Sequence, residues 1–552
     1  MSGGNGFVVP TKPAASAARP SWIMPAVTAF LVAYCALAVM SMHLEPRGYD
    51  WDHHMFRVQE IAWLWSHGTF WPEVSPFMAG NSLLPVYAVY SPFPYFPAVV
   101  LHLLGMPPLL SLFVVAGAAM LAFACVLLSW LTSALGPTRG GLACVAIFSS
   151  AYFQANLFAR FAYPELLALC VLPLAARAIW SVLLRCTSVS FARAELATAI
   201  VFLLHPLTFA NCAVFATMFL VARVVVRPSA DSSARVGRLL LLLALAPVGS
   251  ACLTYPLVSN LSEVRGQWNQ LVQWITPPRL NPGLIDPLWL WSGLALALLF
   301  TRASQTLRRS ILWPLVVVAA SAIFLSLHWS QWFWAHMAWP RVNLFPWRLI
   351  PFYVWPALIV VCAWLPQRRA WIGAAALIVA IQVATQVELG WMMVDSRDTT
   401  RVDLAQVFAT YATRRTGWGV DEFLPTESEA QRLPFGEAPL LPYDSKHVHA
   451  TRVVYDCGSS GCAPGSVTLE PYYRERLRFA IDGVALKPVA VNADWRPVIV
   501  VPAHGRRISV EAVRDPWSLP SQLWSVIALV SLVLLRFRWS RRSRTHGGTV
   551  EL

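Results

Sequence analysis

The sequence predicts a mainly α-helical, polytopic integral membrane protein with about twelve transmembrane helices and a β-sandwich-like domain before the last helix. Of its 552 residues, 57% are hydrophobic and only 13% are charged, and the mean hydropathy is +0.55. Apolar runs of membrane-spanning length recur along the chain, whereas strand-like alternation is confined to one polar stretch near its end. A soluble protein of this length needs more polar surface, so soluble globular classes are excluded.

The first apolar run, Ser21 to Met42, follows Lys12 and Arg19 and is long enough to cross a membrane. A cleaved signal peptide is excluded, because the run is too long and no small-residue cleavage site precedes the next loop. We therefore expect an uncleaved first helix with a cytoplasmic N-terminus. The expected parts are 1–42 (N-terminus and first helix), 43–106 (periplasmic first loop with interfacial helices), 107–387 (helical body), 388–517 (periplasmic β-rich domain) and 518–552 (last helix and basic cytoplasmic tail).

Residues 43–106 are too polar at their start and too proline-rich at their end to form ordinary spans. The segment from Asp52 to His67 suits a helix that lies at the interface, with its tryptophans at headgroup level. The run from Tyr90 to Leu104 is expected to be re-entrant or interfacial, because counting it as a span would invert every later loop. The remaining spans are expected at 107–134, 141–158, 166–184, 191–204, 207–225, 239–257, 285–301, 310–326, 348–365, 370–387 and 518–536.

The distribution of charge predicts the orientation. With both termini inside, the inner segments and span ends hold 20 basic residues against Glu195, Asp231 and Glu551, while the other 25 acids lie outside. This positive-inside bias predicts a multi-pass protein of the bacterial inner membrane with both termini cytoplasmic. It also explains the net charge of +14 through anionic membrane lipid, so no nucleic-acid partner is expected.

The polar stretch before the last span predicts a small antiparallel sandwich, because turn signals separate its period-two segments. Those segments are 452–455, 466–470, 475–481, 496–501 and 507–513. Cys457 and Cys462 lie close together there and are expected to form a disulfide in an oxidising periplasm. Zinc is the alternative, but only His447 and His449 lie nearby as further ligands.

Ionisable residues at the membrane edge are energetically costly and are therefore candidates for function. The first loop holds Asp50, Asp52, His53, His54 and Arg57 in close succession. A helix cap needs only one aspartate, so this cluster predicts a functional role, with capping as the structural alternative.

Later outer loops add four more candidates. Arg160 and Glu165 stand near the start of a span, where an ion pair that joins span ends is the structural alternative. His205, before a proline, is as much a turn residue as a ligand. Arg348, at the entrance of a span, either reaches the headgroups or binds an anion. Together these residues suit transfer from a lipid-phosphate donor, in which an acid acts as general base and arginines hold the phosphate.

Short motifs also follow one another in a characteristic order from about residue 43 to 425. They are Asp52-His-His54-Met-Phe-Arg57, His67-Gly-Thr-Phe-Trp-Pro72, Gly80-Asn, Tyr90-Ser-Pro-Phe-Pro-Tyr95, Arg160-Phe-Ala-Tyr-Pro-Glu165, His205-Pro-Leu-Thr208, Phe345-Pro-Trp-Arg348 and Tyr411 through Glu422-Phe-Leu-Pro425. In this order they resemble the GT-C superfamily of membrane glycosyltransferases, in particular the bacterial membrane proteins labelled 6-pyruvoyl-tetrahydropterin-synthase-related. We do not take that label to mean pterin chemistry.

The resemblance implies a GT-C helical body, a polyprenyl-phosphate sugar donor and a catalytic acid in the first loop, here Asp50 or Asp52. Two positions depart from the family pattern. Glu73 stands where the family often has arginine, and Phe161 stands where it usually has glycine. Both departures bear on the choice of donor or acceptor.

The leading hypothesis is therefore inverting transfer of a sugar from a polyprenyl-phosphate donor to a glycan or lipid acceptor of the cell envelope. Asp52, with Asp50 as its rival, would be the base, and Arg160 and Arg348 would hold the phosphate. The expected substrate-binding residues are His53, His54, Arg57, Arg160, Glu165, His205 and Arg348.

Two questions stay open at this point. Asp52 with His53 or His54 could hold a divalent metal ion, but no complete ligand set is visible in the sequence. The alternative functions are a non-catalytic protein of envelope polysaccharide assembly or export, and a receptor or scaffold that uses the sandwich. A transporter should show inverted repeats or broken helices, and the sequence predicts neither.

Overall fold

The computed structural model of the chain describes residues 50–78, 83–148, 150–154, 156–157, 161–184, 187–226, 228, 232–261, 313–326, 330, 346–364, 441–442, 444–471, 473, 476–491, 496–513 and 515–545. Several expected features lie outside these residues, among them the first helix at 21–42, the spans at 285–301 and 370–387, and Arg160.

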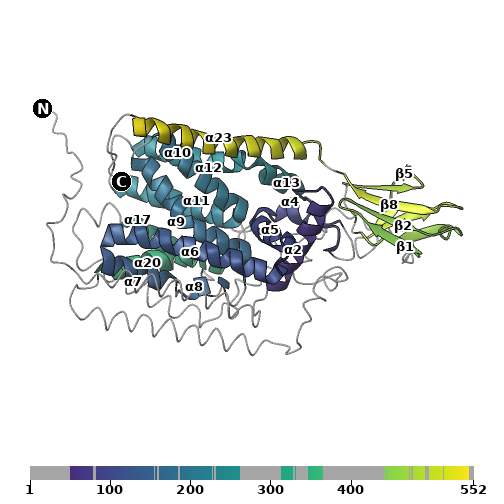
Figure 1. Cartoon of the computed structure of the whole chain (residues 1–552), viewed down its shortest axis with the longest axis horizontal. Helices are drawn as coiled ribbons and strands as arrows, with labels where there is room; N and C mark the ends of the chain where they lie inside the picture. Colours follow the sequence, from purple (N-terminus) through teal and green to yellow (C-terminus); the bar gives the residue numbers. More distant parts are fainter. Residues whose placement is uncertain are drawn as a thin grey trace, which may run out of the picture.

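The described helices form an elongated bundle, and the β-strands project from one end of it (Figure 1). The bundle consists of α6 (Pro108–Leu135), α7 (Pro137–Phe148), α8 (Ala151–Gln154), α9 (Tyr163–Leu184), α10 (Ser188–Leu204), α11 (Pro206–Val226), α12 (Ser232–Gly249), α13 (Ala251–Leu261), α17 (Trp313–Ser326), η5 (Pro346–Leu349), α20 (Pro351–Trp364) and α23 (Ser518–Thr545). Its interior is a continuous apolar cluster in which the rings of Phe123, Phe148 and Phe153 pack together.

Local sequence signals account for helix ends within this bundle. Thr187 begins α10 with a capping box, because its hydroxyl accepts from the amide of Ser190 while the Ser190 hydroxyl accepts from the amide of Thr187. Gly136 ends α6 at φ 84°, a left-handed conformation that glycine adopts without strain. Pro137 then starts α7, where its missing N–H is not needed.

Four of the described helices, α6, α9, α11 and α12, are long and apolar enough to cross a membrane. Shorter apolar helices lie at Phe93–Leu103, Trp313–Leu325, Pro351–Cys362 and Ser518–Leu534. The described part of the chain is therefore mainly helical with several candidate spans, but it does not show the full expected number.

The first loop forms a layer between the bundle and the strands (Figure 1). The layer consists of α2 (Trp51–Ser66), α4 (Val86–Val89), η1 (Phe93–Tyr95) and α5 (Phe96–Leu103). α2 begins and ends within a residue of the expected interfacial helix, but Phe56, Val58 and Ile61 are fully buried and α2 packs on α5 and α6. Its apolar side thus contacts protein. α5 has only 8 residues, too few to cross a membrane alone.

Two expected spans are interrupted. The span at 239–257 consists of α12 and α13, which meet at Ser250, and the span at 141–158 breaks after α7. The sequence did not predict the interruption of the span at 239–257. Pro247 and Pro256 each lack a backbone donor, and the amide of Ser250 donates to Ala246 at 3.1 Å and to Pro247 at 3.2 Å, which tightens the turn.

The strands form two antiparallel sheets, ordered β1-β2-β8-β4-β5 and β3-β7-β6, around a shared apolar core. The strands are β1 (Ser445–Val448), β2 (Arg452–Asp456), β3 (Gly465–Thr468), β4 (Leu477–Ile481), β5 (Val484–Leu486), β6 (Ala490–Val491), β7 (Pro497–Val501) and β8 (Arg507–Ala512). Asp482 and Gly483, both at positive φ, join β4 to β5 in a two-residue hairpin turn. We call residues 441–513 the β domain.

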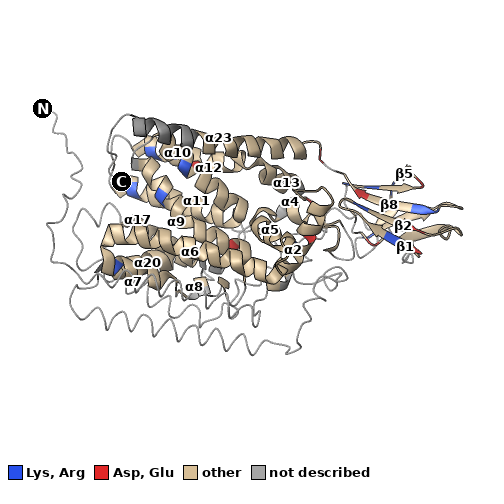
Figure 2. Ribbon diagram, in the orientation of Figure 1, with Lys and Arg blue, Asp and Glu red and all other residues tan. Residues whose placement is uncertain are grey.

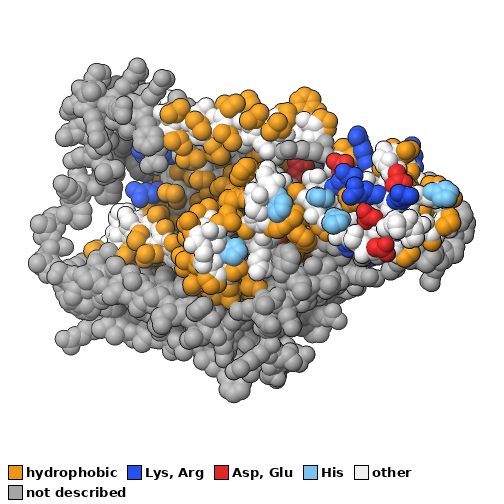
Figure 3. All heavy atoms as spheres, turned by 45° about the vertical axis from the view of Figure 1, so that its right-hand side comes forward, with side chains coloured by type: hydrophobic (Ala, Val, Ile, Leu, Met, Phe, Trp, Pro, Cys, Tyr) orange, Lys and Arg blue, Asp and Glu red, His pale blue; other side chains and the backbone are white. Residues whose placement is uncertain are grey.

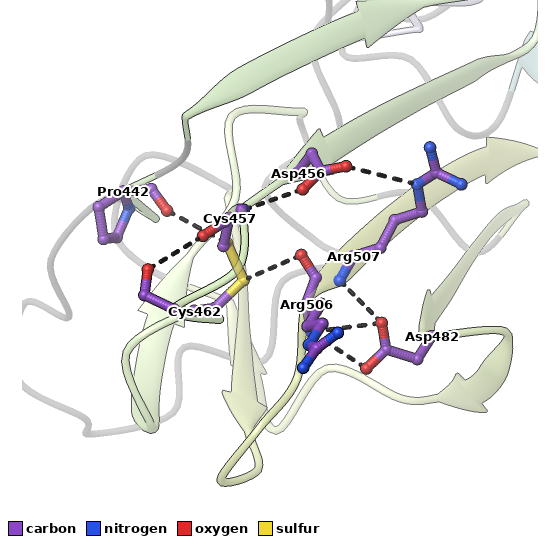
Figure 4. Close-up of a disulfide and its surroundings, with 9 residues drawn as sticks. Pro442, Asp456, Cys457, Cys462, Asp482, Arg506 and Arg507 are labelled. Atoms are coloured by element: carbon purple, nitrogen blue, oxygen red, sulfur yellow. Dashed lines mark hydrogen bonds and ion pairs between the residues drawn. A yellow bond between two sulfur atoms is a disulfide. The ribbon is translucent and has the colours of Figure 1, made fainter.

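Cys457 and Cys462 form a disulfide with a Cα–Cα distance of 4.9 Å (Figure 4). The backbone amides of the two cysteines donate to the carbonyls of Arg506 and Gly505, at 2.9 and 2.7 Å. The cross-linked loop is thereby attached to the turn that leads into β8.

Several contacts join the β domain to the helices. Arg476 lies 3.1 Å from Asp515 and donates to the backbone oxygen of Ser259 on α13 at 3.2 Å. Leu83 of the first loop is part of the apolar core of the β domain. Glu73, where the family often has arginine, accepts a hydrogen bond from the hydroxyl of Ser518. The β domain is therefore fixed to both the first loop and the start of α23.

Charge is unevenly distributed over these parts. In the described helices, lysine and arginine gather toward the end of the bundle that is remote from the strands (Figure 2). Hydrophobic side chains cover most of the visible helical surface, while charged side chains gather over the strands (Figure 3). This is the arrangement expected for a body in lipid and a domain in water.

Candidate active site

The site begins at the first turn of α2, where the acids and histidines of the first loop lie. Asp50 is the N-cap residue: its backbone oxygen accepts from the amide of His54 at 3.2 Å, and its side chain makes no capping hydrogen bond. The structural alternative of side-chain capping thus does not apply to Asp50. His53 is 5% exposed, so it lies inside the fold. Asp52 is on α2, and its side chain lies outside the described atoms.

Tyr95 joins His54 to Arg57. Its hydroxyl lies 2.7 Å from Nδ1 of His54 and accepts from Nη1 of Arg57 at 3.0 Å. The amide of Tyr163 donates to Nε2 of His54 at 3.3 Å, so in the neutral ring Nδ1 carries the hydrogen and donates to Tyr95. Burial raises the pKa of Tyr95 above its ordinary value, although Arg57 opposes the shift, so this hydroxyl stays neutral.

Arg57 is held from a second side by an aromatic ring. Its guanidinium carbon lies 4.2 Å from the ring centre of Tyr90, in a cation–π contact, and only 3% of the residue is exposed. Tyr90 in turn contacts the ring of His205 edge-on, with a centroid distance of 6.5 Å. The structure thus brings α2 and the turn before α11 together.

His205 also has a local role. Its Nδ1 accepts from the amide of Thr208 at 3.1 Å and lies 2.7 Å from the Thr208 hydroxyl, so the ring caps the first turn of α11. The interpretation of His205 as a turn residue therefore has direct structural support.

Glu165 and Arg348 form a second polar group at the start of α9. Nε of Arg348 lies 3.4 Å from Oε2 of Glu165, and the hydroxyl of Tyr152 donates to Oε1. Both charged side chains are largely buried, with 10% of Arg348 and 4% of Glu165 exposed. Among the described residues, Glu165 thus pairs with Arg348. The pair of Arg160 with Glu165, the structural alternative, lies outside them.

Phe161 stands where the family usually has glycine, and its backbone conformation is one that favours glycine. Its φ is 51°, in the left-handed region that glycine adopts without strain and that phenylalanine rarely adopts. The ring is fully buried against Phe113, His54 and Tyr163. The aromatic contacts offset the backbone strain beside the candidate site.

Glu60 fixes the shape of the first loop. Its carboxylate accepts hydrogen bonds from the hydroxyl of Ser75 at 2.7 and 2.8 Å, the amide of Phe77 at 3.0 Å and the hydroxyl of Tyr87 at 2.6 Å. Burial raises its pKa to about 7, and the hydrogen bonds oppose that shift. Glu60 therefore stabilises the loop that carries the site.

Sequence reasoning missed the uncharged members of these groups. Tyr90, Tyr95 and Tyr163 stand within the motifs, but a search for ionisable residues at the membrane edge does not select tyrosines. Tyr152 lies outside every motif, and no sequence signal marks it. Among the described side chains, no three His, Cys, Asp or Glu residues lie together so as to hold a metal ion.

No protein-family model and no curated protein sequence matches the chain. Among solved structures, the chain is similar to the arabinofuranosyltransferase AftD from Mycobacteria, with a TM-score of 0.42, 16% identity, and coverage of 91% of this chain and 40% of that chain. A mutant of the same enzyme gives a TM-score of 0.43 at 17% identity, covering 67% of this chain and 28% of that chain.

The chain thus spans less than half the length of these proteins. Both TM-scores are below one half, so the likeness carries no argument about activity. The motif resemblance to the 6-pyruvoyl-tetrahydropterin-synthase-related proteins stays a prediction, since no family model matches.

Proposed function

We propose that this protein is a membrane glycosyltransferase that transfers a sugar from a polyprenyl-phosphate-linked donor to a glycan or lipid acceptor of the cell envelope, on the periplasmic face. The observation that carries the proposal is the position of the acidic first turn of α2. The helix lies at the end of an apolar bundle, in the layer between the bundle and the strands, and its His54 and Arg57 form a buried group with Tyr95. A lipid-linked donor needs such a junction between an apolar body and water.

In the proposed reaction, Asp52, or Asp50 as its rival, accepts the proton of the acceptor hydroxyl. The hydroxyl oxygen attacks the anomeric carbon of the sugar, and the bond from that carbon to the phosphate oxygen breaks. The polyprenyl phosphate leaves with the bonding electrons. Attack from the side opposite the leaving group inverts the configuration.

Arg348 and Arg160 are the proposed partners of the leaving phosphate, whose negative charge grows in the transition state. The contact of Arg348 with Glu165 through Nε supports this role, since it fixes the direction of the guanidinium. Arg57 is 3% exposed and held by Tyr90 and Tyr95, which supports a positioning role for it. We propose that His53, His54 and His205 line the acceptor side of the site.

The test is transfer of label in membranes that contain the protein. They are incubated with radiolabelled polyprenyl-phosphate sugars, and the label that enters envelope glycan or lipid is measured. Asparagine keeps the shape of aspartate but cannot accept the proton, so Asp52→Asn or Asp50→Asn should lower transfer by about 100-fold or more. Glu511→Gln removes an exposed carboxylate on β8 and is the matched control that should keep parental transfer.

Equal transfer by the parent and both aspartate variants would exclude either aspartate as the base. No transfer by the parent from any donor tested would favour the second candidate, a non-catalytic role in envelope polysaccharide export. The broken helix at Ser250 favours that candidate, because transporters commonly use broken helices. Export without transfer predicts that glycan accumulates inside the cell when the gene is deleted, while its sugar composition is unchanged.

A further inference from the structure

A carboxyl group lies buried in the helical body, outside the site described above. Glu195 is seven residues beyond the start of α10, about 10 Å along the helix axis, and only 5% of it is exposed. A charged side chain at such a position is costly and marks a functional site by default.

The carboxyl of Glu195 has no hydrogen-bond or ion-pair partner in the described structure, and its Oε2 is fully buried. Thr198, one turn away, shows the ordinary alternative, since its hydroxyl donates to backbone oxygens of α10. The titratable groups on the helices packed against α10 are Tyr95 on η1, Tyr163, Glu165, Cys170 and Arg177 on α9, Cys212 and Arg223 on α11, and Arg235 and Arg238 on α12; the described side chains of α23, at 518–534, include no titratable group. None of these pairs with Glu195.

The carboxyl lies against the break between α12 and α13. A Cβ on Gly249 would be 3.6 Å from Oε1 of Glu195. Ser250, the next residue, is fully buried, and its hydroxyl also has no partner. Two oxygen-bearing side chains with unused hydrogen-bonding capacity thus lie at the break, one against Gly249 and one on the adjacent residue.

The backbone of the break, by contrast, is well satisfied by α23. Nε1 of Trp524 donates to the carbonyl of Val248 at 2.9 Å, and the amide of Cys252 donates to the hydroxyl of Ser525 at 2.8 Å. Contacts with α23 therefore fix the conformation of the break, and the groups left without partners are the Glu195 carboxyl and the Ser250 hydroxyl.

We propose that Glu195 and Ser250 form a binding site for one monovalent cation, a proton or a sodium ion, at the α12–α13 break. An unpaired carboxylate in a nonpolar interior must be neutralised, and one carboxylate balances one positive charge. The hydroxyl adds a neutral oxygen, and oxygens are the ligands that hard cations prefer. The proposal is independent of the proposed transferase activity.

The test is labelling of the full-length protein in membranes with dicyclohexylcarbodiimide, a lipophilic reagent that modifies protonated buried carboxyls. Mass spectrometry of the digested protein locates the label. We expect label on Glu195 and none on Glu165, whose carboxyl oxygens are engaged by Arg348 and Tyr152. If the cation is a proton, the rate falls about tenfold for each pH unit above the midpoint. If it is sodium, sodium at ten times its Kd lowers the rate about tenfold.

Ser250→Ala should shift the pH midpoint or weaken the protection by sodium, and Thr198→Val is the matched control that should do neither. Glu195→Gln should abolish the label at this position. The proposal is overturned if Glu195 is not labelled at any pH, or if its labelling depends on neither pH nor sodium, because the carboxyl would then be a permanently protonated packing group.

Discussion

At the scale of single residues, the hydroxyl of Tyr95 connects His54 and Arg57, two side chains that α2 presents to the site. It is the shared partner of His54 and Arg57, and all three side chains are almost fully buried. A buried donor that loses its acceptor keeps its full desolvation cost. The orientation of the first turn of α2 therefore depends on an oxygen atom that carries no charge.

Tyr95→Phe removes that oxygen and leaves the ring in place. We expect the free energy of unfolding to fall by about 1–3 kcal/mol and transfer activity to fall with it, because His54 and Arg57 lose their common acceptor. Thermal unfolding in detergent measures the first effect and the label-transfer assay the second. Tyr90→Phe, which keeps the aromatic face against Arg57, is the comparison variant. A Tyr95→Phe protein as stable and active as the parent would contradict this account.

Glu60 should make stability depend on pH. Its pKa is raised from 4.5 to about 7 in the folded protein, so the folded state binds the proton more tightly than the unfolded state does. The stabilisation is fully present below about pH 4.5 and is lost as the pH rises to about 7, a change of about 3 kcal/mol. Thermal unfolding of the parent and of Glu60→Gln across this range measures it. The stability of the parent should change more steeply with pH than that of Glu60→Gln. Parallel curves of stability against pH would refute the assignment to Glu60.

Phe161 allows a test of backbone strain against packing. Phe161→Ala should cost about 3–5 kcal/mol through loss of the buried ring. Phe161→Gly loses the same ring but adopts the φ of 51° without strain, so it should be about 1 kcal/mol more stable than the alanine variant. At most positions a glycine variant is less stable than the alanine variant. Thermal unfolding measures both, and a Phe161→Gly protein less stable than Phe161→Ala would rule out backbone strain at this position.

The sequence predicted the charged residues of the site better than their partners. Charge at the membrane edge is visible in a sequence, and it selected His54, Arg57, Glu165 and Arg348. Which residues pair is set by the packing of helices that lie far apart along the chain. Arg348 therefore reached Glu165 across 183 positions, a contact that no spacing rule predicts.

At the scale of elements, apolar runs and alternating segments in the sequence located most of the described helices and strands. The interruptions within the spans expected at 141–158 and 239–257 were not predicted. The run 239–257 is apolar enough overall to be interpreted as one span, so its hydropathy did not reveal the interruption at Ser250. Pro247 and Pro256 were the available signal, but proline is tolerated inside membrane helices when other groups satisfy the backbone. At this break, Trp524 and Ser525 of α23, nearly 300 positions later, satisfy the carbonyl of Val248 and the amide of Cys252.

The disulfide loop is the element whose removal is simplest to test. Cys457 and Cys462 are five positions apart, and the chain-entropy model assigns such a short loop a stabilisation of about 2 kcal/mol. The double variant Cys457→Ser with Cys462→Ser should therefore open the β domain to protease sooner than the parent. Reductant should accelerate cleavage of the parent but not of the variant. Equal cleavage of both proteins without reductant would show that the hydrogen bonds to Gly505 and Arg506 suffice.

At the scale of the whole molecule, charge placement predicts a fixed orientation across the membrane. Basic side chains of the described helices gather at one end of the bundle, and the β domain lies at the other (Figure 2). A phosphatase reporter that is active only in the periplasm should therefore be inactive when fused after Arg369 and active when fused near Ser460. The opposite pattern of reporter activity would mean that the orientation is the reverse of the predicted one, with the first loop in the cytoplasm.

The attachment of α23 to the break between α12 and α13 has a consequence for biosynthesis. The partners of Val248 and Cys252 are 276 and 273 positions later in the chain. While the ribosome is still making the intervening residues, α12 and α13 can be inserted but their junction cannot be completed. A nascent chain that stops before Trp524 would leave the carbonyl of Val248 and the amide of Cys252 without the partners that α23 supplies, which is costly in a nonpolar environment. The junction between α12 and α13 is thus completed only once α23 has been made.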